Sequence, residues 1–201
     1  MKLYYAPGAC SMASHILLNE LGVAYELEKV DLKTHRTEKD QDFYKINPKG
    51  YVPALQLDNG KLLTENIAIL SYLSDSKAGQ QAVVSKDNMD HYQKLEWLAF
   101  ISTELHKGFS PLFNKANPPE VLQASKEKIT KRLDLVNKHL ENQKFMMGDT
   151  FGPADAYLFT VLSWCPKVSV DLSPWKNLVS FVERLSSRPA IQKTMKEEGL
   201  K

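Results

Sequence analysis

The feature that most constrains the fold is a change of pattern near residue 75. Before this point, short apolar runs typical of strands alternate with stretches whose apolar residues recur at helical spacing. After it, helical spacing continues and no convincing strand is found. A chain of 201 residues divided in this way predicts an α/β domain followed by an all-helical domain.

The first part predicts the element order β-α-β-α-β-β-α. Strands are expected at residues 3–5, 25–30, 51–57 and 61–63, and helices at residues 11–21, 43–46 and 65–74. Asp58-Asn59-Gly60 separates the last two strands, and Asn-Gly between apolar runs is a strong hairpin signal. A strand-helix-strand crossover followed by a hairpin predicts a mixed sheet of four strands with helices packed on it.

The second part predicts a helical bundle. Apolar rows at helical spacing cover residues 89–106, 122–140, 154–164 and 178–185, and the third is apolar nearly all round, as in a buried helix. The polar run 75–88 between the two parts predicts a linker. We therefore expect domains at residues 1–79 and 86–201.

Composition excludes several classes of protein. A net charge of +2, with basic residues spread along the chain, argues against a nucleic-acid surface. No apolar stretch approaches the roughly 18 residues that a membrane span needs, and no signal-peptide pattern is present. Two cysteines make no disulfide framework, and no Cys/His cluster has the spacing of a zinc site. We expect a cytoplasmic protein without a metal.

Cys10 is the first candidate for chemistry, because it follows a strand and a short loop at the start of a helix. A helix N-terminus favours a thiolate. Cys10-Ser11-Met12-Ala13 lacks the second cysteine of a Cys-x-x-Cys motif, which excludes an intramolecular dithiol cycle but allows a mixed disulfide with an external thiol. An inert buried thiol with Ser11 capping the helix is an equally good interpretation.

Three further features allow both a structural and a functional interpretation. A trans Val52-Pro53 bond is the common case, whereas a cis bond would free the Val52 backbone to pair with a peptide-like ligand. Glu65 and Asn66 fit a helix start, and they also fit a site for an ammonium and a carboxylate. His106 shares a helix face with Thr103 and Ala99, where a lone histidine is usually a surface or packing residue.

Five segments together carry a resemblance to a known family. They are residues 5–11, 47–55, 63–65, 103–109 and 154–159. In this order and at these separations, they resemble the cytosolic glutathione transferases, specifically the bacterial beta class. The resemblance implies a thioredoxin-like N-terminal domain, an all-helical C-terminal domain and a two-fold homodimer. It implies conjugation of the glutathione thiolate to small hydrophobic electrophiles, as in detoxification, with possible thiol-disulfide or peroxidase side activity.

The resemblance also implies roles at the catalytic centre. Cys10 faces the sulfur of glutathione, which is a co-substrate, and His106 reaches the same region from the helical domain. Thr103 and Glu104 line the site, and Glu104 approaches from a partner subunit.

The remaining implied contacts hold the tripeptide. Val52, before a cis-Pro53, pairs through its backbone with the cysteinyl part, and Glu65 with Asn66 holds the γ-glutamyl end. The expected glutathione-binding set is completed by Ser11 and His35.

The chain departs from the family pattern at a few positions. His35 replaces a lysine near the glycyl carboxylate, Ala99 replaces an asparagine, and Asn66 replaces a smaller residue. At the start of the buried helix, Gly152 lacks the hydroxyl of a capping box, although Asp155 fits its third position. Two alternatives therefore stay open: a monothiol glutathione-dependent reductase, and a non-catalytic binding protein of the same fold.

Overall fold

The computed structural model describes residues 1–76 and 88–200. They divide into two compact units, of which the first consists of residues 1–76 and 188–200 and the second of residues 88–187. The sequence placed the segment after residue 187 in the helical domain. The structure groups it with the first unit, because its helix packs along the first helix of the chain. The predicted linker at 75–88 lies, apart from its ends, outside the described residues.

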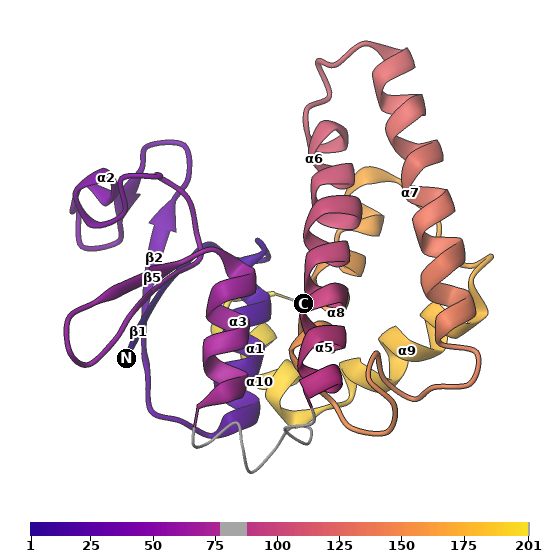
Figure 1. Ribbon diagram of the computed structural model, residues 1–201. Coiled ribbons are helices and arrows are strands. Elements are labelled where there is room, and N and C mark those ends of the chain that lie inside the picture. The colour runs from indigo at the N-terminus through magenta and orange to yellow at the C-terminus, as the bar shows by residue number, and fades with distance from the viewer. Residues whose placement is uncertain (77–87, 201) are drawn as a thin grey trace. The chain divides into compact units, whose positions relative to one another are not determined.

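The first unit contains a mixed sheet covered by helices (Figure 1). Its strands are β1 (Lys2–Tyr5), β2 (Glu26–Asp31), β3 (Arg36–Thr37), β4 (Ala54–Gln56) and β5 (Leu62–Thr64), and its helices are α1 (Ser11–Leu21), α2 (Phe43–Ile46), α3 (Asn66–Asp75) and α10 (Pro189–Glu197). The strand order is β3-β2-β1-β4-β5. The central strand β1 pairs parallel with β2 and antiparallel with β4.

The expected count of four strands is corrected to five. Strand β3 has two residues, paired antiparallel with the end of β2. Asp31 closes the turn between them, since its carboxylate accepts hydrogen bonds from the N–H groups of Lys33 and Thr34. Two residues are too few to show the alternation by which a strand is recognised in a sequence.

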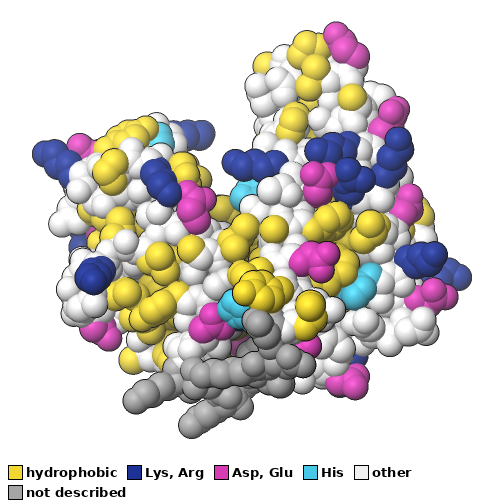
Figure 2. All heavy atoms as spheres, viewed as in Figure 1, with side chains coloured by type: hydrophobic (Ala, Val, Ile, Leu, Met, Phe, Trp, Pro, Cys, Tyr) yellow, Lys and Arg dark blue, Asp and Glu magenta, His cyan; other side chains and the backbone are white. Residues whose placement is uncertain are grey.

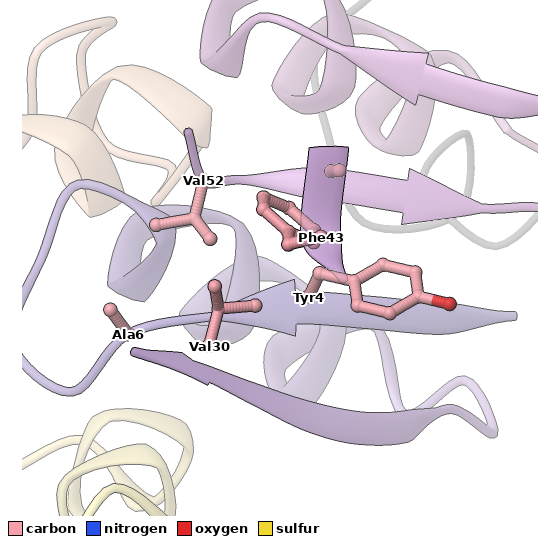
Figure 3. Packing of buried hydrophobic residues seen from close by; sticks show 6 residues of the cluster. Tyr4, Ala6, Val30, Phe43 and Val52 are labelled. Atoms are coloured by element: carbon pink, nitrogen blue, oxygen red, sulfur yellow. The ribbon is translucent and has the colours of Figure 1, made fainter. Parts of the chain in front are cut away.

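A small apolar core lies on the side of the sheet that carries α2. Phe43 of α2 is fully buried and packs with residues from β1, β2 and the entry to β4 (Figure 3). These partners are Tyr4, Ala6, Val30, Val52 and Ala54. Ala6 and Val52 lie at the ends of this cluster from which the loops before α1 and before β4 depart. Burial of these side chains therefore fixes the ends of both loops.

Within its described residues, the second unit has helices and helical turns as its regular elements, and no named strand. Its elements are α5 (Asn88–Phe100), a π-helical segment η1 (Ile101–His106), α6 (Lys107–Phe113), α7 (Pro119–His139), α8 (Pro153–Leu162), a 3₁₀ turn η2 (Cys165–Val168) and α9 (Lys176–Ser186). All ten residues of α8 are buried, as the sequence predicts, and α8 packs against α5, η1 and α9. Helices α6 and α7 lie side by side (Figure 1).

The start of α8 depends on Asp155. Its side chain is fully buried and accepts hydrogen bonds from the N–H groups of Gly152 and Met146, each at 2.8 Å. The predicted half of the capping box is therefore formed, while glycine at position 152 supplies no hydroxyl for the other half. The same carboxylate fixes both the first turn of α8 and the loop that precedes it.

Candidate functional site

Cys10 occupies the N-cap position of α1, where the sequence places it. Its side chain is half-buried, and its Sγ lies 3.4 Å from the backbone oxygen of Val52, 42 residues away. Gly8, with φ of 66°, allows the turn that brings Cys10 to the helix start. The thiol therefore lies where the N–H groups of the first helical turn converge.

Ser11 does not offer its hydroxyl to this position. The side chain is fully buried, and its Oγ accepts from the N–H of Ala6 and donates to the oxygen of Ala6. The hydroxyl thus closes the loop on which Cys10 lies. Unlike the hydroxyl, the backbone N–H of Ser11 has no hydrogen-bond partner within residues 1–76 and 88–200.

The Val52-Pro53 peptide bond is cis. The N–H of Val52 has no hydrogen-bond partner in the described part of the chain, while its oxygen faces Cys10. His35 lies on the same loop system, because its Nδ1 is 2.9 Å from the oxygen of Gly50. Its ring packs on the Tyr44 ring with centroids 4.6 Å apart. The cis bond therefore leaves the N–H of Val52 unpaired and directs its oxygen to Cys10, while the Val52 side chain packs in the core.

Glu65 and Asn66 stand at the start of α3. Glu65 has φ of 69°, and its Oε1 accepts from the ammonium of Lys49 and from the hydroxyl of Tyr51. The Lys49 ammonium stands in for the ligand ammonium that the sequence predicts at Glu65. Lys49 and Tyr51 were missed in the sequence, since only the folded loop brings them to α3.

Asn66 has a different role from the one expected for its side chain. Its amide is buried, with Oδ1 accepting from Ser14 at 2.7 Å and Nδ2 donating to the oxygen of Cys10 at 3.1 Å. The side chain ties α3 to α1. A ligand carboxylate at this helix start would be met mainly by backbone N–H groups.

In the second unit, Thr103, Glu104 and His106 all lie in the π-helical segment η1. Thr103 is exposed and its hydroxyl donates to the oxygen of Ala99. The sequence predicted that Thr103 and His106 would share one face of an α-helix. The wider π turn changes the angle between successive residues, and His106 is half-buried where Thr103 is not.

Glu104 is bound within its own chain. Its Oε2 lies 2.7 Å from Nε of Arg132 and 3.6 Å from Nζ of Lys128, both on α7. The hydrogen bond from Arg132 lowers the pKa of the Glu104 carboxyl. Figure 2 shows basic side chains gathered over α6 and α7 around an acidic one.

His106 lies in an aromatic environment. Its Nδ1 is 2.7 Å from the hydroxyl of Tyr157 on α8, and its ring meets the Trp164 ring edge-on at 4.9 Å. Burial, assisted by the charge of Lys107, lowers the pKa of His106 from 6.5 to about 4. The imidazole is therefore neutral at pH 7, and when Tyr157 donates to Nδ1 the proton lies on Nε2. Tyr157 was missed because 51 residues separate it from His106.

The comparisons with known proteins agree along the whole chain. The N-terminal domain of glutathione S-transferase matches residues 1–75, and the C-terminal domain matches residues 100–189. Glutathione S-transferase GstA of Escherichia coli O157:H7 is 45% identical over 201 residues, which cover 100% of both chains. The chain belongs to the glutathione S-transferase family.

Solved structures support the same family. A ternary complex of BphK, a bacterial glutathione S-transferase, has a TM-score of 0.96 at 46% identity, with 100% of both chains covered. A sphingomonad glutathione S-transferase complexed with glutathione has a TM-score of 0.95 at 39% identity, again with 100% of both chains covered. A beta-class enzyme from Sphingomonas chungbukensis is equally similar in sequence. The expected family, class and architecture are thereby confirmed.

Within the transferase, the second cysteine is remote from this chemistry. Cys165 is fully buried at the start of η2, and burial raises the pKa of its thiol to about 12. Residues 1–76 and 88–200 contain no group of three or more His, Cys, Asp and Glu side chains suited to a metal ion. In that same part of the chain, no helix is both long and apolar enough to cross a membrane.

Proposed function

We propose that this transferase binds glutathione along the loop before β4 and activates its thiol at the start of α1. The observation that carries the proposal is the meeting of three groups: the Cys10 thiol, the Val52 main chain before a cis proline, and the N-terminus of α1. An extended peptide can pair with the N–H and the oxygen of a single residue as an added strand. The activated thiolate then attacks a small hydrophobic electrophile.

The required stabilisation of the thiolate can be apportioned. Lowering a thiol pKa by about two units from about 8.5 takes about 2.7 kcal/mol. A helix N-terminus supplies about 0.3–1 kcal/mol, and a hydrogen bond to a charged group about 1.5–3 kcal/mol. At least one donor is therefore needed. The backbone N–H of Ser11 is suited to this role, whereas the Ser11 hydroxyl is already engaged with Ala6.

We assign the other ends of glutathione by the charges that the first unit offers. Glu65 receives the γ-glutamyl ammonium in place of Lys49, and the first N–H groups of α3 receive the adjacent carboxylate. His35 lies by the loop that carries Val52 and is placed nearest the glycyl end. A histidine there offers a ring N–H as hydrogen-bond donor in place of the ammonium of a lysine.

For the second unit, we propose that neutral His106 donates from Nε2 to the reacting sulfur, with Thr103 and Glu104 lining the site. The family resemblance supports this assignment, and so does the neutral imidazole held by Tyr157. We further propose a homodimer that acts in the cytoplasm. Neither Cys10 nor Cys165 is in a disulfide, which fits a reducing compartment. Sedimentation at micromolar concentration tests the dimer.

Replacing Cys10 separates the roles of the two sulfurs. We expect Cys10→Ala to abolish turnover of mixed disulfides, because that reaction needs a protein sulfur, and to reduce conjugation of a chloronitrobenzene by about tenfold or less. Parallel assays of both activities measure this. Cys165→Ala is the matched control and should retain both, since Cys165 is buried away from solvent. Equal losses of the two activities in Cys10→Ala would count against the proposal.

A reductase is the second candidate function, favoured by the half-exposed thiol of Cys10 at a helix N-terminus. In this reaction the Cys10 thiolate attacks the glutathione sulfur of a mixed disulfide between glutathione and a second thiol, releases that thiol and forms a Cys10–glutathione disulfide. A second glutathione thiolate then attacks this disulfide, which restores the Cys10 thiolate and releases oxidised glutathione. Turnover of mixed disulfides without turnover of the arene would favour it. Binding of glutathione with neither activity would instead indicate a non-catalytic binding protein.

A further inference from the structure

His35 is held by one contact of its main chain and two contacts of its ring, all within the first unit. Its backbone, with φ of 52°, accepts a hydrogen bond from the N–H of Phe43 at 2.8 Å. In the ring, Nδ1 lies 2.9 Å from the backbone oxygen of Gly50. One face of the ring packs on Tyr44 of α2. These contacts fix the orientation of the imidazole on the loop before β4.

The contact with Gly50 decides which nitrogen of the His35 ring carries a proton. A backbone oxygen can only accept a hydrogen bond, so Nδ1 must be the donor. In a neutral imidazole the other nitrogen, Nε2, then has no proton and can only accept. Nε2 has no hydrogen-bond partner in the described part of the chain. It becomes a donor only when the ring takes up a proton from solvent and forms an imidazolium.

The charged groups around this imidazole have partners of their own or lie in solvent. Within residues 1–76 and 88–200, no ion pair joins the ring to another side chain. The ionisable groups on its own segment and on the elements packed against it are Arg36, Asp42, Tyr44, Lys45 and Lys49. Lys49 pairs with Glu65, and Arg36 pairs with Asp40. Asp42 caps α2, and the remaining two side chains are exposed. The arrival of a ligand carboxylate is therefore the main change of charge that this ring can meet.

From this geometry we propose that His35 binds the glycyl carboxylate of glutathione as an imidazolium, so that binding takes up a proton at Nε2 and weakens as the pH rises. An imidazolium N–H donates a charge-assisted hydrogen bond to a carboxylate, whereas the lone pair of an unprotonated Nε2 repels it. The inference rests on the proposed function, which places this carboxylate at His35.

The proton requirement is particular to histidine at this position. Histidine is the side chain that ordinarily changes charge between about pH 5 and 8, whereas a lysine stays charged throughout that range. Because the bound state holds one more proton than the free state, affinity is greatest at low pH and is lost as the pH rises.

S-Methylglutathione is the probe that isolates this effect, because its thioether cannot ionise and so removes the opposite pH dependence of the thiol. We expect its Kd for the full-length protein, measured by calorimetry, to rise about fivefold from about pH 5.5 to about pH 7.5. Titrations in two buffers of different ionisation enthalpy should show net proton uptake. His106 does not contribute, since its pKa of about 4 keeps it neutral in this range.

Two variants identify the group that takes up the proton. His35→Lys should bind the probe with nearly the same Kd across this range and without proton uptake, because its charge is permanent. His91→Gln is the matched control, since it removes a histidine on α5 in the second unit and should keep the wild-type profile. A wild-type profile in His35→Lys would overturn the proposal.

The C-terminal amide of S-methylglutathione tests the carboxylate. It lacks the negative charge, so its Kd for the wild type should lose the pH dependence. An equal pH dependence for the acid and the amide would assign the proton to another site and overturn the proposal.

A last measurement uses the protein without ligand. Proton–nitrogen correlation spectra of the histidine rings, with His35 identified by its absence in His35→Gln, should show the Nδ1–H tautomer at alkaline pH. The Nε2–H tautomer would overturn the proposal. Binding of S-methylglutathione with a flat pH profile would overturn this inference alone, whereas no binding at any pH would overturn the proposed function together with it.

Discussion

The two units hold their candidate site residues by different means. In the first unit, the turn at residues 6–11 is held by buried polar side chains that bind its main chain, namely Ser11, Asn66 and Glu198. In the second unit, His106 is held through its own side chain, by one hydroxyl and the edges of two aromatic rings. A site held through its main chain tolerates a change of Cys10 itself better than a change of its anchors. A site held through a buried titratable ring depends on pH.

The largest expected effect tests whether the second unit also depends on main-chain anchoring. Asp155→Ala removes the acceptor of two buried N–H groups at the start of α8, two residues before Tyr157. Hydrogen bonds to a buried charge contribute about 2 kcal/mol each, so we expect a loss of about 4 kcal/mol in the free energy of unfolding. Urea denaturation measures it.

Asp155→Asn is the control for this change, since its amide oxygen keeps one of the two acceptors and should recover about half of the loss. A loss below about 1 kcal/mol in Asp155→Ala would show that aromatic packing alone fixes α8. Anchoring through main-chain hydrogen bonds would then be a property of the first unit, and not of the second.

The next effect concerns pH and belongs to His106. Its pKa is about 4 in the folded protein and 6.5 when unfolded, so the unfolded state binds the proton more tightly. Stability is therefore greatest above pH 6.5 and falls as the pH drops toward 4, by roughly 3 kcal/mol in total. The free energy of unfolding of wild type and His106→Gln, measured between pH 4 and 7.5, gives this difference. Parallel curves for the two proteins would rule out a buried neutral His106.

A smaller effect is expected from an anchor of the first unit. Asn66→Ala removes the donor to the Cys10 oxygen and leaves the buried hydroxyl of Ser14 without its acceptor. We expect a loss of about 2 kcal/mol in stability. Glutathione affinity should fall less than in Glu65→Gln, because the backbone N–H groups of α3 remain. Calorimetry with glutathione compares the two variants. A larger loss of glutathione affinity in Asn66→Ala than in Glu65→Gln would indicate that the Asn66 amide binds the ligand.

The contrast between the units also separates what the sequence could and could not predict. Helix α1 was predicted to its bounds, because helical spacing of apolar residues ends at Gly22, which adopts φ of 63° as a left-handed C-cap. That predicted helix start alone places Cys10 at the N-terminus of α1. Val52 and Glu65 were also singled out from the sequence, and the resemblance to a family favoured their functional interpretation. Local signals of this kind are read directly from neighbouring residues.

The missed features depend on contacts between distant residues. Glu198 meets Gly8 across 190 residues and Tyr157 meets His106 across 51, and no local pattern encodes either pair. The π-helical segment was missed because apolar spacing indicates a helix without specifying which carbonyl each N–H binds. The predicted role of the Asn66 side chain changed for the same reason, since Ser14 and Cys10 reach it only after α1 and α3 have packed together.

The smallest expected effect tests how far the main chain of the first unit resists change. Gly50 has φ of +71°, and a Cβ there would lie 2.3 Å from Cε1 of Tyr44. Tyr44 is 48% exposed, so its ring can swing into solvent and relieve the contact. The cost that remains is the left-handed backbone, about 1 kcal/mol, and Gly50→Ala should lose about that much stability.

A double-mutant cycle with Tyr44→Ala separates the two parts of this cost. If the ring moves freely, the effects of Gly50→Ala and Tyr44→Ala add to within about 0.5 kcal/mol. If the ring is held by its packing on His35, the double variant should be more stable than that sum by about 1 kcal/mol or more. The second result would show that an aromatic contact fixes this loop too, so that anchoring through main-chain hydrogen bonds would be a property of the Cys10 turn and not of the first unit as a whole.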